Sequence, residues 1–165
     1  MRQYDKSEFK TDKQRSVTNS KMLSNRYIPL DMKCLLSGYF SDSERQNLRE
    51  DLVATEAEKL AKILAALEPE LTITQLRKFF NEVRSIEERM KEDNFQKAFI
   101  LMLKSKVAYS VAKKSSKVPK QFKDFIDACV DKINDEKDFF GFVKFFESVV
   151  GFFYYFKEEL KPNRE

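Results

Sequence analysis

The chain has 165 residues, of which 35% are charged and 42% hydrophobic, and its 31 basic and 27 acidic side chains leave a net charge of +4. This length corresponds to one domain with a core of its own, and the scarcity of turn residues, with three glycines and four prolines, favours long helices. The sequence contains no histidine, which excludes the commonest general base and the commonest metal ligand.

The first part of the chain differs from the rest. Residues 1–26 are polar and basic and show no hydrophobic period, so we predict a mobile basic arm followed by a single helical-bundle domain at 27–165. The arm has no apolar segment of the kind found in secretory signals. The sequence therefore predicts a cytoplasmic protein.

Helix signals begin after the arm. The segment 27–40 is apolar and is expected to form a short helix that ends near Gly38. The stretch 43–46 (SERQ) has the form of a capping box, and apolar residues recur behind it at helical spacing. A second capping box, from Thr72 to Gln75, would begin the next helix, although Thr74 could be its cap instead.

Three more helices are predicted further along the chain. One covers about 95–113 and is capped by Asp93 or Asn94, the next carries a core face from Phe122 to Ile133, and the last covers about 136–160. The sequence contains no credible strand. The predicted fold class is all-α, a compact bundle of about five helices.

Signals of catalysis are missing. The acidic residues are spread along helices within reach of a basic neighbour, and the sequence has neither a glycine-rich phosphate loop nor a nucleophile elbow. Cys34 and Cys129 form no CxxC pair, and Cys129 lies on an apolar stripe, so we expect a buried free thiol. We predict that the protein is not an enzyme and holds no cofactor and no metal.

The last helix is apolar on nearly all sides. It holds eight of the chain's sixteen phenylalanines, but Lys144 and Glu147 argue against a membrane span. Two interpretations stay open. The helix is either the central core helix, or part of its surface packs on another subunit around Phe152, Phe153 and Phe156, which would make the protein a homo-oligomer.

The strongest charge signal is a run of lysines. Residues 104–123 hold seven lysines and no acidic residue. Unopposed positive charge repels itself, so its presence indicates a polyanionic partner, and nucleic acid fits best. The alternative is a purely structural α-helical oligomerisation protein whose lysines form a solvated face.

Helix geometry narrows the set of candidate cations. At about 100° per residue, Lys106 and Lys113 share one side of the helix, and Lys97 and Lys104 share the opposite side. Arg77 joins the candidates because it has no acidic residue three or four positions away. The predicted patch consists of Lys106, Lys113, Lys114, Lys117 and Lys120.

Three segments carry a family resemblance. In chain order they are LTITQLRKFFNEV (71–83), KSKVAYSVAKK (104–114) and FFGFVKFFESVVGFFYYFK (139–157). Together they resemble the small subunit of type III-A (Csm-type) CRISPR effector complexes, over about residues 71–160. The first 40 residues offer no support. The family pattern often has Arg where Lys113 stands, and lysine keeps the charge but not the bidentate phosphate contact.

The resemblance implies an all-helical, non-catalytic protein of antiviral defence. It would sit in several copies along the effector ribonucleoprotein, beside other CRISPR effector subunits, and line the path of the guide RNA and target RNA. By matching position it implies RNA contacts for Arg77, Lys78, Lys106 and Lys113. Lys78 is the weaker candidate because Glu82 could pair with it. Contacts to phosphates carry no sequence information, so we expect binding to be independent of RNA sequence.

Overall fold

The computed structural model describes Tyr27, residues 29–92 and 95–113, Ser115 and residues 117–159. The predicted arm at 1–26, the two predicted caps at 93–94 and the candidate Lys114 lie outside these residues.

Within the described residues the fold is all-α, which confirms the predicted class. The α-helices are α2 (Ala57–Ala65), α3 (Ile73–Glu92), α4 (Lys97–Ala112), α5 (Lys120–Asp131) and α6 (Glu136–Glu159). A π-helical segment, η2 (Leu52–Glu56), leads directly into α2, and a short 3-10 helix, η1 (Lys33–Leu35), precedes it. The β pairing in this part of the chain is limited to an isolated bridge between Phe40 and Leu48.

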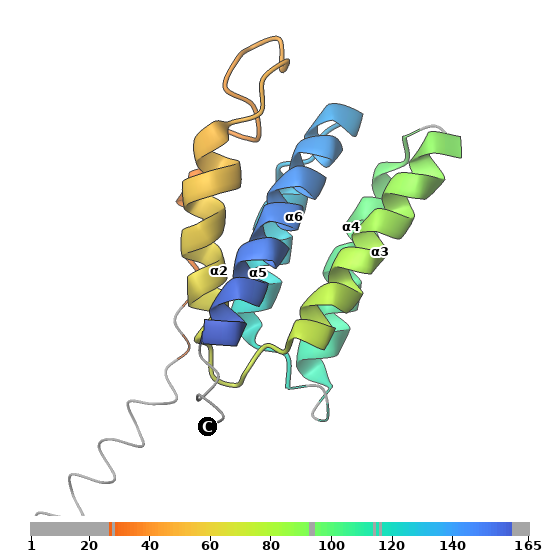
Figure 1. Ribbon diagram of the computed structural model, residues 1–165. Coiled ribbons are helices and arrows are strands. Elements are labelled where there is room, and N and C mark those ends of the chain that lie inside the picture. Colours follow the sequence, from red (N-terminus) through yellow and green to blue (C-terminus); the bar gives the residue numbers. More distant parts are fainter. Residues whose placement is uncertain (1–26, 28, 93–94, 114, 116, 160–165) are drawn as a thin grey trace, which may run out of the picture.

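The helices form two layers. Figure 1 shows α2, α6 and α3 side by side, with α5 behind α6 and α4 behind α3. Helix α3 runs upward in this view, whereas α4 runs downward and α5 runs upward again. As a result, the start of α3, the end of α4 and the start of α5 all lie at the same, lower end of the bundle.

Helix α6 lies at the centre of the core. Its Phe146 ring packs against Phe80 of α3 and Phe125 of α5, with ring centroids 5.4 Å and 5.1 Å apart. By length and composition α6 could cross a membrane, but half of its most apolar stretch is buried inside the bundle. These aromatic contacts explain the unusual phenylalanine content, because a central helix must present apolar surface on several sides.

The predicted helix beginnings have mixed outcomes. The Thr72 capping box is confirmed, since the Thr72 N–H donates to Gln75 Oε1 (2.9 Å) and the Gln75 N–H donates to Thr72 Oγ1 (3.2 Å). The predicted box at 43–46 is wrong. There the Asp42 carboxylate accepts the N–H groups of Gln46 and Asn47 and closes a loop before the helix begins.

The segment before α2 is less helical than predicted. The helix expected at 27–40 is reduced to η1, and Gly38 follows it with a φ of +72°, in the left-handed region that glycine adopts without strain. The segment is nevertheless packed, because Leu35 and Tyr39 are both buried in the core.

Candidate nucleic-acid interface

Acidic residues from neighbouring helices reach the lysine-rich stretch. Lys104 of α4 pairs with Asp131 of α5, and Lys106 of α4 pairs with Glu82 of α3. The prediction that this stretch is unopposed is therefore wrong for these two lysines. The partners lie 27 and 24 positions away in the sequence, so only the packing of antiparallel helices brings them together.

Lys123 of α5 also has a partner. Its ammonium donates to the Asp127 carboxylate one turn later, and this hydrogen bond raises the pKa of Lys123. The pair is an ordinary helix-surface contact. Lys123 therefore does not extend the candidate surface.

The end of α4 and the loop behind it keep their exposed positive charge. Lys113 follows the last residue of α4, Lys117 lies in the loop with a φ of 51°, and Lys120 begins α5. Lys113 and Lys117 make no ion pair within the described part of the chain. The Lys120 ammonium lies 5.5 Å from the centre of the Tyr27 ring, a cation–π contact that leaves its charge in place.

Arg77 and Lys78 add two exposed cations from α3. Neither takes part in an ion pair with any residue that the structure describes. The sequence suggests Glu82 as a partner for Lys78, but the Glu82 carboxylate reaches Lys106 instead. Further along α3, Arg84 pairs with Glu87 and Lys91 with Glu88, whereas the Arg89 guanidinium lies over the Phe99 ring, 4.9 Å from its centre.

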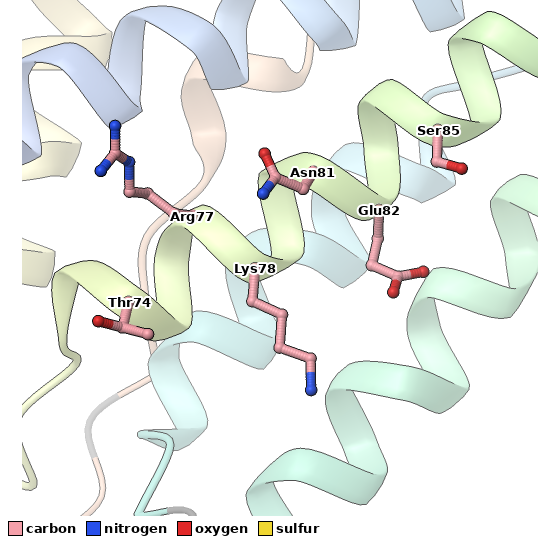
Figure 2. Close-up of a pocket in the computed structure, with 6 residues that line it drawn as sticks. All are labelled: Thr74, Arg77, Lys78, Asn81, Glu82 and Ser85. Carbon is pink, nitrogen blue, oxygen red and sulfur yellow. The ribbon is translucent and has the colours of Figure 1, made fainter.

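A shallow hollow of about 450 Å³ runs along this half of α3. Figure 2 shows Lys78 and Glu82 extending to one side of the helix and Arg77 to the other. The residues that line the hollow are Thr74, Arg77, Lys78, Asn81, Glu82 and Ser85. All of them except Glu82 carry a hydrogen-bond donor, so the hollow suits an anion with several acceptor oxygens.

The exposed cations come together at the lower end of the bundle in Figure 1. The first half of α3 packs against the start of α5, where the rings of Phe79 and Phe122 lie 5.0 Å apart, and the end of α4 leads into the same region. We call this set the basic end, and it consists of Arg77, Lys78, Lys113, Lys117 and Lys120. Lys106 lies beside it with its charge opposed by Glu82.

The three candidate interface residues of α6 differ in exposure. Phe153 is only 1% exposed and packs inside the chain, as the core-helix interpretation expects for this residue. Phe152 and Phe156 are half-buried, with the Lys62 ammonium 5.9 Å from the centre of the Phe156 ring. The exposed aromatic residues of α6 are Phe140, Tyr154 and Tyr155, which periodicity alone does not distinguish from core residues.

Among the residues that the structure describes, the titratable groups of the core form no further site. In the described ranges, Asp, Glu and Cys side chains never gather in a group of three or more that could hold a metal ion. Cys129 is a fully buried free thiol, as predicted, and burial raises its pKa well above the ordinary value. Cys34 is a half-buried free thiol, and its pKa is likewise raised by desolvation.

Comparison with known proteins identifies the family. A family model described as Csm2 Type III-A matches residues 47–159. This match begins before η2 and therefore includes α2. The family resemblance noted from the sequence covers only about residues 71–160 and does not include α2. No curated protein and no solved structure matches the chain significantly. Since the family model covers more than half of the chain, this all-α protein belongs to the Csm2 type III-A family, whose members are the non-catalytic small subunit of the Csm CRISPR effector complex.

Proposed function

We propose that this subunit binds RNA through its basic end, by contacts to phosphates rather than to bases. Family membership implies the other Csm subunits and the guide RNA as partners. Beyond family membership, we propose that the basic end is the binding surface and that it recognises the phosphates of both guide RNA and target RNA. The observation that carries it is the gathering of exposed cations from α3, the α4–α5 loop and the start of α5 at one end of the bundle.

The composition of the basic end supports binding without sequence specificity. Lysine ammonium groups act as point charges and contact phosphates whatever the base, and an effector complex must accept many guides. Lys106 contributes less than we expected from the sequence, because Glu82 opposes its charge. As a subunit of a CRISPR effector complex, the protein is proposed to work in the cytoplasm, as the sequence predicts.

The experiment compares two double variants of the full chain. Lys78→Ala/Lys113→Ala removes two charges from the basic end, whereas Lys97→Ala/Lys137→Ala removes two exposed lysines near the starts of α4 and α6, at the opposite end. We expect the first pair to weaken RNA binding by about fivefold per contact, since two charges 4 Å apart in water attract by about 1 kcal/mol. The control pair should change binding much less.

The RNAs in this titration have unrelated sequences, and each protein is measured alone and within the reassembled effector complex. The proposal requires the same factor of loss for every RNA. A loss that depends on RNA sequence, an equal loss in the control pair, or no RNA binding in either setting would contradict it. The last result would favour the alternative, a structural helical protein whose lysines only face solvent.

We also infer that copies of this chain contact each other through α6. The supporting observation is the set of large exposed aromatic side chains on that helix, with Tyr154 48% and Tyr155 55% exposed. Exposed aromatic surface of this kind usually marks a contact. Light scattering should give a mass above that of one chain at micromolar concentration, and Tyr154→Glu should lower it. A monomeric wild-type protein would contradict the inference.

A further inference from the structure

Glu82 holds an unexpected position next to the basic end. It lies four residues after Lys78 on α3, the spacing of an ordinary helix-surface ion pair. Its carboxylate instead pairs with Lys106 on α4 and bridges the two helices. The side chains of Lys106 and Glu82 remain 43% and 39% exposed, so both can move without disturbing the core.

Glu82 is also the one acidic residue among the six that line the hollow on α3. The other five each offer a hydrogen-bond donor, and Arg77 and Lys78 add positive charge. Figure 2 shows the Glu82 carboxylate on the same side of α3 as the Lys78 ammonium. An anion that enters the hollow beside Lys78 therefore meets the carboxylate that already holds Lys106.

We propose that Glu82 is a built-in competitor of RNA phosphate for Lys106, an inference that rests on the proposed RNA binding by the basic end. Carboxylate and phosphate oxygens both accept hydrogen bonds from an ammonium group. A phosphate beside Lys78 places a second negative charge near Glu82, and their repulsion favours release of the carboxylate to solvent. The release costs little because exposed ion pairs contribute little stability. Lys106 then contacts the phosphate, and Glu82 limits the affinity of the surface.

Four variants of the full chain test this competition, with affinity for a mixed-sequence single-stranded RNA as the readout, alone and in the reassembled complex. Glu82→Gln keeps the shape of the side chain and frees Lys106, so it should tighten binding by about threefold, the scale of an exposed ion pair. The slope of log K against log salt should stay close to that of the wild type, because Lys106 contacts a phosphate in both bound proteins.

The other variants fix the order of affinities. Glu82→Gln/Lys106→Ala should return to the wild-type affinity, because it removes both members of a neutral pair. Lys106→Ala alone should bind most weakly, since it leaves the Glu82 carboxylate free to oppose Lys78. The matched control is Glu88→Gln, which removes an acidic partner of Lys91 on the same helix, away from the hollow. It should leave RNA affinity unchanged.

Three results would overturn the inference. If Glu88→Gln tightened RNA binding as much as Glu82→Gln, the effect would come from the net charge of the protein alone. A double variant as tight as Glu82→Gln would show that Lys106 is not the group released. Unchanged or weaker binding by Glu82→Gln would remove the competition altogether. None of these results touches the proposed RNA binding, which the weaker affinity of Lys78→Ala/Lys113→Ala tests separately.

Discussion

Tyr39 occupies the space that a side chain at Gly141 would need. A Cβ built on Gly141 of α6 would lie 2.5 Å from Tyr39 Cβ and 2.9 Å from Tyr39 Cγ. The ring of Tyr39 cannot move away freely, because it is buried and its hydroxyl donates to the Cys129 carbonyl of α5 (2.8 Å). This close approach fixes the segment before α2 against two helices of the core.

Gly141→Ala should therefore destabilise the protein. The added methyl group overpacks the contact with Tyr39, which typically costs about 1–3 kcal/mol and outweighs the gain of up to about 1 kcal/mol in helix propensity. Chemical denaturation measures the change in the free energy of unfolding.

The matched control lies ten residues further along the same helix. A Cβ at Gly151 meets no atom within 4 Å, so Gly151→Ala should raise stability by up to about 1 kcal/mol. If both substitutions had the same sign, the contact between Tyr39 and Gly141 would not be the reason for glycine at 141.

Thr72→Ala should weaken the start of α3. The substitution removes the hydroxyl that accepts the Gln75 N–H, and the loss of such a cap costs about 1 kcal/mol. Thr74→Ala removes a neighbouring threonine that does not cap the helix and should change the urea midpoint much less. Equal losses of stability for the two variants would be inconsistent with Thr72 as the cap.

The Tyr27 hydroxyl should titrate late. It donates a hydrogen bond to Asp124 Oδ2, which also accepts the Leu30 N–H. Because ionisation of the phenol would break the hydrogen bond to Asp124, this bond raises the pKa of Tyr27 from 10.0 to about 12. The neutral phenol is thus favoured in the folded state. The stability that this hydrogen bond supplies is complete below about pH 10 and disappears as the pH rises toward 12.

Tyrosine absorbance of the folded protein, compared between wild type and Tyr27→Phe, measures this directly. The difference between the two titration curves gives the ionisation of Tyr27, and it should appear near pH 12. If it appears near pH 10, the hydrogen bond to Asp124 does not hold the proton.

The sequence predicts those features that depend on local spacing. The apolar stripes predict α4 and α6 to within about two residues of their observed ends, because burial of one face repeats with the helical period. The capping box at Thr72 is predictable for the same reason, since both of its hydrogen bonds join residues three apart. The box predicted at 43–46 fails because Asp42 takes the backbone donors there.

Features that depend on which helices pack together could not be predicted. The acidic partner of Lys106 is on α3, and no spacing rule within α4 indicates it. Phe153 and Tyr154 are neighbours on an aromatic helix, but only the positions of α2 and α3 against α6 decide that the first is buried and the second exposed. Arg77 and Lys78 are candidates from the sequence, and their RNA contacts stay a prediction.

The salt dependence of RNA binding tests the central claim most directly. Lys78→Ala/Lys113→Ala should reduce the slope of log K against log salt by about 0.7–0.9 for each phosphate that is no longer bound. Thermal stability should stay almost unchanged, because these exposed lysines have no ion-pair partner in the described structure. Lys97→Ala/Lys137→Ala should leave the slope close to that of the wild type. A wild-type slope in the first variant, or the same reduction in both, would contradict RNA binding by the basic end.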